Sequence, residues 1–205
     1  MPRTPGPRGA YAKTPQRREE ILDAAFGVFA RYGYLNSSMS EIAKRAGMTM
    51  PGVTHHFPTK SGLLEAVLQR RDLDAAGHLE GRRGVDLLLG LLEIAERDER
   101  DRGLTQLFAI LAAEATIDDH PAHEYFRARY ELILANVWRA FDEAKEDGDL
   151  RPGVVPGEAA QMYAALSDGL QLQRLYGVAS TRQEELTRRF LESVLSVPLD
   201  PHRPA

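Results

Sequence analysis

The sequence contains no cysteine and no long uninterrupted run of apolar residues. The absence of cysteine excludes a disulfide framework and any thiolate chemistry. The longest apolar stretches, around residues 85–92 and 107–113, are far too short to span a bilayer. The basic N-terminal stretch lacks the apolar core of a signal peptide. We therefore expect a cytoplasmic protein, and the contents of 43% hydrophobic and 27% charged residues suit a globular one.

Catalytic and metal-binding patterns are also missing. We find no nucleophile–base pairing and no glycine-rich phosphate loop. The stretch DDHPAHE has a metal-like composition, but a helix capped by Asp119 or His120, with Pro121 in its first turn, explains its spacing. We expect no enzymatic activity, no cofactor and no metal site.

Alternation of period two, hairpin dipeptides and internal repeats are absent as well. From Gln16 onward, apolar residues recur at helical spacing, which predicts an all-α fold of about nine helices. A second capping box, formed by Thr181 and Glu184, predicts the start of the last helix. Residues 1–15 hold four prolines and little apolar mass, so we expect a flexible basic arm. Residues 199–205 are expected to form a loose tail.

Charge is unevenly distributed along the chain. Residues 1–60 contain nine Lys and Arg against four Asp and Glu, a net charge of +5. The remainder carries −9, because the total is −4. A basic head on an acidic body is typical of a protein whose head alone meets a polyanion. Chance variation of the surface explains the asymmetry equally well, so charge alone does not decide.

The stretch SSMSEIAKRAGMTMPGVTHHFPTK predicts two short helices joined at a glycine. Ser38 and Glu41 form a capping box at the start of the first helix, and Gly47 ends it. Thr49 can cap the second helix, and Pro51 lies in its first turn, where backbone N–H groups have no intrahelical partner. This is the shape of a helix-turn-helix, whose second helix enters the major groove of DNA. The same shape can also serve only for packing.

The longer segment RREEILDAAFGVFARYGYLNSSMSEIAKRAGMTMPGVTHHFPTKSGLLEAVL resembles the DNA-binding head of the tetracycline-repressor (TetR-like) family. The resemblance implies a ligand-responsive transcriptional regulator, most often a repressor, that binds a pseudo-palindromic operator as a homodimer. It also implies a helix-turn-helix domain over residues 16–60 and a helical body over residues 61–198. The body would bind a small-molecule effector, and the last two helices would form the dimer interface.

The resemblance, together with the outward positions of the second short helix, indicates which residues meet double-stranded DNA. They are Ser37, Ser38, Thr49, Met50, Gly52, Thr54, His55, His56 and Lys60. Two of them depart from the family pattern: Thr54 stands where tyrosine is usual, and Met50 where a lysine or polar residue is common. Both changes remove reach or charge, so we expect apolar contacts with thymine methyl groups. They also motivate an alternative, a small-molecule-binding or adaptor protein with a degenerate DNA-binding head.

Two carboxylates in the body are candidate ligand-pocket acids. Glu114 continues the apolar stripe of Leu107 and Leu111, and Asp168 is a similar case. Each either forms an ordinary salt bridge at a half-exposed edge or favours a cationic or hydrogen-bonding ligand. With aromatic residues that could equally be core, the candidate pocket is Phe108, Leu111, Glu114, Phe126, Tyr130, Trp138 and Asp168. The candidate dimer interface on the last two helices is Met162, Leu166, Leu170, Leu186, Phe190 and Val194.

Overall fold

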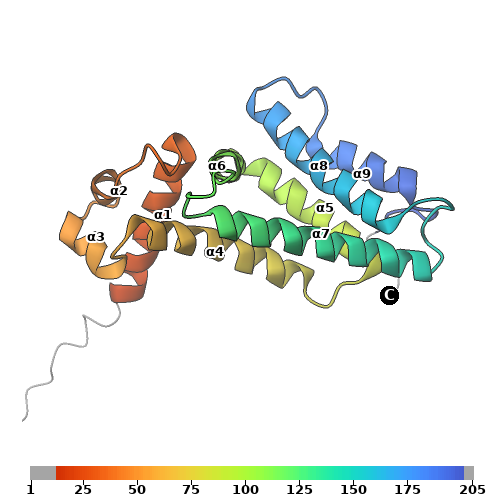
Figure 1. Ribbon diagram of the computed structural model, residues 1–205, viewed down its shortest axis with the longest axis horizontal. Helices are drawn as coiled ribbons and strands as arrows, with labels where there is room; N and C mark the ends of the chain where they lie inside the picture. Colours follow the sequence, from red (N-terminus) through yellow and green to blue (C-terminus); the bar gives the residue numbers. More distant parts are fainter. Residues whose placement is uncertain (1–12, 201–205) are drawn as a thin grey trace, which may run out of the picture. The chain divides into compact units, whose positions relative to one another are not determined.

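The structure is a computed structural model that describes residues 13–200. Within this range the chain forms nine helices and no strand beyond one antiparallel bridge between Leu150 and Leu195 (Figure 1). The helices are α1 (Lys13–Tyr32), α2 (Met39–Arg45), α3 (Met50–His56), α4 (Lys60–Leu79), α5 (Gly84–Arg100), α6 (Arg102–Glu114), α7 (His123–Glu146), α8 (Pro156–Leu175) and α9 (Gln183–Val194). The predicted all-α fold of about nine helices is confirmed. Most of the predicted arm (residues 1–15) and of the predicted tail (residues 199–205) lies outside the described residues.

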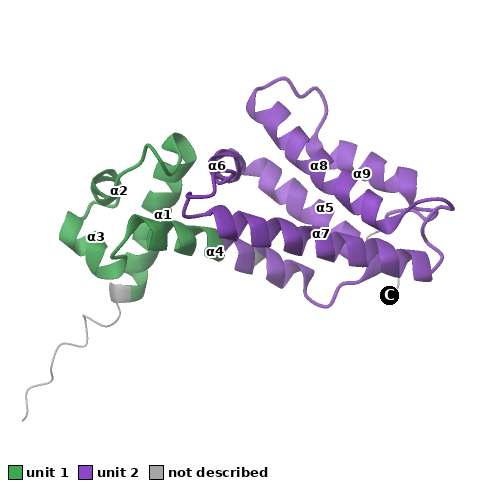
Figure 2. Ribbon diagram, in the orientation of Figure 1, with its two compact units in different colours: residues 1–70 green, residues 71–205 purple. Residues whose placement is uncertain are grey.

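The chain divides into two compact units, residues 1–70 and 71–205 (Figure 2). The first unit consists of α1, α2, α3 and the first half of α4. Its core is built from apolar side chains that recur at helical spacing on all four helices. The fully buried members include Ile21, Val28, Phe29, Ile42, Val53, Leu63 and Leu64. The second unit begins inside α4 and contains all later helices.

Helix α5 lies at the centre of the second unit's core. It packs against α7 and α9, and α7 packs along α8 (Figure 1). Residues 84–94 of α5 are apolar on almost every side, so only a position surrounded by other helices hides their side chains from water. Leu88 and Leu92 of α5 are buried with Phe141 of α7 and Leu191 of α9 in one continuous cluster.

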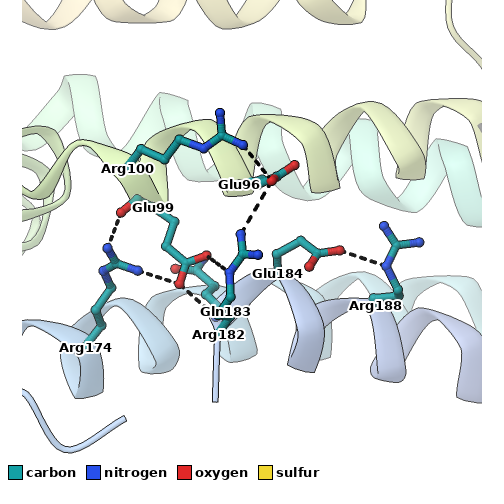
Figure 3. Close-up of polar contacts among 8 residues, drawn as sticks. All are labelled: Glu96, Glu99, Arg100, Arg174, Arg182, Gln183, Glu184 and Arg188. Carbon is teal, nitrogen blue, oxygen red and sulfur yellow. Dashed lines mark hydrogen bonds and ion pairs between the residues drawn. The ribbon is translucent and has the colours of Figure 1, made fainter. Parts of the chain in front are cut away.

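A buried carboxylate joins α5 to α8 and α9 (Figure 3). Glu99 is 7% exposed. Its side chain accepts a hydrogen bond from the backbone N–H of Gln183 at 3.3 Å and forms ion pairs with Arg174 and Arg182. Arg174 also donates to the Glu99 carbonyl oxygen. The start of α9 is therefore held by a residue 84 positions earlier in the chain.

The predicted capping box at the start of α9 is wrong. Arg182 occupies the N-cap position without a side-chain cap, and the helix begins at Gln183, after Thr181. Glu184 instead pairs with Arg188 one turn later at 2.8 Å. A local cap is not needed here because the Glu99 carboxylate accepts from the first backbone N–H of the helix.

The predicted start of α7 is also wrong. The helix begins at His123, so Pro121 precedes it instead of lying in its first turn. The His120 ring is buried, and its Nδ1 accepts a hydrogen bond from the backbone N–H of Ala122 at 3.1 Å. This contact stabilises a turn at the residues that would otherwise begin the helix.

Candidate nucleic-acid interface and ligand cavity

Two local caps fix the short helices of the first unit. The Ser38 hydroxyl accepts from the backbone N–H of Glu41 at 3.1 Å, and the Thr49 hydroxyl accepts from that of Gly52 at 3.3 Å. Gly47, between the helices, has φ = 64°, a left-handed conformation that favours glycine. The predicted caps of α2 and α3, and the glycine turn between these helices, are confirmed.

Helix α3 has one buried and one exposed side. Val53 is fully buried, while Met50, Pro51 and His55 are exposed. Thr54 is half-buried, and its hydroxyl lies within hydrogen-bonding distance of the carbonyl oxygens of Met50 and Pro51, at 3.2 and 3.3 Å. The hydroxyl is thus directed at its own helix.

Two of the predicted DNA contacts, Ser37 and Lys60, help to hold the turn between α1 and α2. The Ser37 hydroxyl is buried and donates to the Tyr34 carbonyl oxygen at 2.7 Å. The Lys60 ammonium donates to the carbonyl oxygens of Tyr34 and Ser37, at 2.7 and 2.8 Å, and lies 4.1 Å from the centre of the Tyr34 ring. These contacts place both side chains beside the N-terminus of α2.

The sequence pattern does not predict the bracing roles of Tyr34 and Arg18. The Arg18 guanidinium lies 4.2 Å from the centre of the Phe57 ring and 3.5 Å from the His56 carbonyl oxygen. It therefore lies against the C-terminal end of α3, where a cation is favourable. The local pattern gave no signal for either role, because both depend on contacts between distant residues.

The second unit contains a cavity of about 580 Å³. Residues from six helices line it, α4 to α9. The lining is mostly apolar and aromatic with a few polar groups, which is the usual composition of a small-molecule site. It includes Ala75, Ala76, Leu79, Leu91, Ile94, Phe108, Ala112, Phe126, Ile133 and Tyr163.

Four of the seven predicted pocket residues line this cavity, namely Phe108, Phe126, Tyr130 and Asp168. The other three do not. Leu111 is fully buried in the core, and Trp138 is exposed, 48% accessible to solvent. The Glu114 carboxylate lies 3.7 Å from Nε2 of the buried His120.

Two ion pairs that the sequence pattern does not predict line the cavity. The Arg71 guanidinium pairs with Asp98, and that of Arg129 pairs with Asp72. The Phe108 ring is a shared contact, because its centre lies 5.7 Å from the Arg71 guanidinium and 4.8 Å from that of Arg129. The Tyr125 hydroxyl also donates to Asp72.

Asp168 also lines the cavity, but its hydrogen-bond donor is a hydroxyl and not an arginine. Its carboxylate accepts a hydrogen bond from the Tyr130 hydroxyl at 2.8 Å. Burial raises the pKa of Asp168 above its usual value, and the Tyr130 hydrogen bond and the Arg129 charge offset this only in part. Burial and the neighbouring Asp168 charge raise the pKa of Tyr130 to about 12, so its hydroxyl stays protonated and donates.

The predicted dimer residues occupy different environments within the described chain. Met162 of α8 is exposed, whereas Leu170 is buried. Leu166, Leu186, Phe190 and Val194 are half-buried. Phe190 and Val194 pack with one side against the core of the second unit.

The two histidines of DDHPAHE have different side-chain contacts. His120 is buried, while Nδ1 of His123 lies 2.9 Å from the Ala115 carbonyl oxygen. Among residues 13–200, no group of three or more His, Asp or Glu side chains is arranged to hold a metal ion. In the same range no helix is both long and apolar enough to cross a bilayer.

Two protein families match the chain in consecutive segments. The family of bacterial regulatory proteins called tetR matches residues 21–67, and the C-terminal family of BetI-type transcriptional repressors matches residues 86–196. The HTH-type transcriptional repressor Rv1474c of Mycobacterium tuberculosis is 30% identical over 170 residues, 74% of this chain and 89% of that protein. The HTH-type transcriptional regulator BetI of Stenotrophomonas maltophilia is 27% identical over 165 residues, 78% of this chain and 81% of that protein.

Solved structures show the same fold. The complex of SmeT with triclosan matches with a TM-score of 0.74 at 26% identity, covering 93% of this chain and 99% of that one. SmeT is described as the repressor of the multidrug efflux pump SmeDEF of Stenotrophomonas maltophilia. A structure of SmeT matches with a TM-score of 0.72 at 26% identity, covering 92% and 96% of the two chains.

Proposed function

The chain belongs to the TetR family of bacterial regulatory proteins, and on this premise we propose that it is a transcriptional repressor controlled by a small molecule. It binds a pseudo-palindromic operator as a homodimer and acts in the cytoplasm without catalysing a reaction. Residues 16–60 form the DNA-binding domain, and residues 61–198 form the effector-binding and dimerisation domain.

The observation that carries this proposal is that α3 has one side buried against the first unit and the other side exposed to solvent. Its apolar side chain Val53 anchors it to the first unit, and Thr49, Met50 and His55 are exposed on the other side. A helix held in this way can insert its N-terminal end into the major groove. No acidic residue lies between Glu41 and Glu65, so no carboxylate in this segment repels the phosphates.

Control by a ligand follows from the cavity and from the continuity of α4. This one helix begins at Lys60, beside the turn that precedes α2, and continues to Arg71 and Asp72, which line the cavity. If α4 can take two positions relative to the rest of the cavity lining, a ligand that binds better to one of them shifts the protein toward it. The SmeT–triclosan complex is the precedent for a small molecule bound by a protein of this fold.

The proposal is tested by selecting bound duplexes from random DNA and measuring their affinity by fluorescence anisotropy. We expect an operator with two half-sites about 34–36 Å apart, or a multiple of that distance. Failure of every selected duplex to bind better than random DNA at moderate salt would contradict it. That result, together with tight binding of a small molecule, would favour the adaptor alternative, which the inward-directed hydroxyl of Thr54 motivates.

Met50→Glu tests the recognition face directly. Met50 is exposed at the first position of α3, so in the proposed complex the new charge would lie at the groove, near the phosphates, without disturbing the core. We expect operator affinity to fall by about 100-fold or more, because a like charge at the groove costs several kcal/mol. The melting temperature should not change. Ile117→Glu, an exposed apolar residue of the second unit, is the matched control and should bind the operator normally.

A further inference from the structure

The cavity of the second unit contains five charged side chains, and four of them neutralise each other. Arg71 pairs with Asp98, and Arg129 pairs with Asp72. Both pairs are largely shielded from solvent, since each of these side chains is at most 33% exposed. A ligand that competes for either arginine has to separate an ion pair in a partly desolvated site, which is unfavourable.

Asp168 is the fifth charged side chain, and it belongs to neither of these two ion pairs. Its hydrogen-bond partner in the cavity is the neutral hydroxyl of Tyr130, at 2.8 Å. The positive charge of Arg129 also acts on this carboxylate, but the Arg129 guanidinium is held by Asp72. Three acidic and two basic side chains thus line the cavity, and the unbalanced negative charge lies at Asp168.

Apolar and aromatic surface surrounds this charge. On the α7 and α8 side of the cavity, Tyr130, Leu132, Asp168 and Leu172 are all exposed to solvent, so a ligand can reach the carboxylate from outside. Phe126 and Tyr163, which also line the cavity, are buried. Aromatic faces attract cations, and apolar walls favour a ligand with little polar surface.

We propose that the cavity binds lipophilic organic cations, with the carboxylate of Asp168 as the group that holds the positive charge. Tyr130 is the positioning residue, because its hydroxyl orients the carboxylate. The assignment rests on the proposed function in taking this cavity as the effector site. The raised pKa of Asp168 is consistent with it, since a carboxylate that is partly desolvated, although solvent still reaches it, gains more from a cationic partner.

Tetraphenylphosphonium and tetraphenylborate test the proposal, because the two ions have nearly the same size and shape and opposite charge. Affinities are measured by isothermal titration calorimetry on the full chain without DNA. We expect the wild type to bind the phosphonium at least about tenfold more tightly, the factor expected for one partly solvated charge pair. Asp168→Asn should bring the two affinities within about threefold of each other.

Glu158→Gln is the matched control, since Glu158 is an exposed acid on the same helix that does not line the cavity. It removes the same charge and should keep the preference for the phosphonium. Equal affinities in the wild type, a preference for the borate, no binding of either ion, or an unchanged preference in Asp168→Asn overturns the proposal. Loss of the preference in Glu158→Gln also overturns it, because the selectivity would then come from net charge.

Operator binding by the same variants separates this inference from the proposed function. Normal operator binding without charge selectivity would reject the cation site and keep the repressor. Charge-selective binding by a protein that recognises no duplex would keep the cation site and reject the repressor.

Discussion

Lys60 illustrates, at the scale of a residue, how a side chain can have a second role that its sequence position does not reveal. The family resemblance predicts a phosphate contact, which stays a prediction. In the structure its ammonium bridges the carbonyl oxygens of Tyr34 and Ser37, 26 and 23 positions earlier. Such a bridge depends on how α1, α2 and α4 pack, and no local pattern encodes it.

Replacing Lys60 with methionine should therefore lower stability as well as DNA affinity. Methionine keeps much of the apolar stem but removes the ammonium that donates to two partly buried carbonyl oxygens, and a hydrogen bond to a charged group contributes about 1.5–3 kcal/mol. Urea unfolding followed by circular dichroism measures the change. Lys44→Met, at an exposed position of α2, is the control and should unfold like the wild type. Equal stability of the Lys60 variant would show that the bridge contributes nothing.

At the scale of an element, helix starts fall into two classes. Ser38 and Thr49 cap α2 and α3 with their own side chains, so sequence spacing was enough to predict them. The start of α7 depends on a turn that the buried His120 stabilises, and the start of α9 depends on the carboxylate of Glu99.

The residues of the cavity could likewise be predicted only in part. Its aromatic residues follow a helical stripe, but the ion pairs of Arg71 and Arg129 join different helices and leave no local signal.

Glu99→Ala should weaken the attachment of α8 and α9 to α5. The substitution removes the acceptor for the Gln183 backbone N–H and the partner of two arginines. Loss of one partner of a fully buried pair costs about 3–5 kcal/mol. Here Arg174 and Arg182 keep access to water, so we expect about 2 kcal/mol from urea unfolding.

Glu96→Ala provides the comparison for this network. Glu96, one turn before Glu99 on α5, pairs with Arg100 and Arg182 (Figure 3). The Glu96 side chain is half-exposed, and those of Arg100 and Arg182 are well exposed. Exposed pairs contribute little, so its unfolding curve should overlay that of the wild type. A larger loss from Glu96→Ala than from Glu99→Ala would contradict the ranking of the two sites.

At the scale of the whole molecule, the two ends of the chain differ in charge as their proposed partners do. The first 60 residues carry +5 and the remainder −9. A basic head is drawn to the phosphates, and an acidic body is repelled from the same duplex, which favours binding through the head alone. Because the resemblance and the family matches both cover the head, its role could be predicted from sequence. The body's ligand preference could not, since it depends on which acids find a basic partner.

The proposed homodimer links the two functions, and Phe190→Asp tests it. Phe190 is half-buried on α9, with one side against the core and the other accessible to a partner. A carboxylate there would be desolvated in an apolar dimer interface, so we expect sedimentation velocity to show mainly monomers at micromolar concentration. Operator affinity should fall by about 100-fold or more, because one head alone keeps only half of the phosphate and base contacts. Ile117→Asp, exposed and outside α8 and α9, should remain dimeric. A Phe190 variant that sediments as a dimer and binds the operator normally would exclude this surface as the interface.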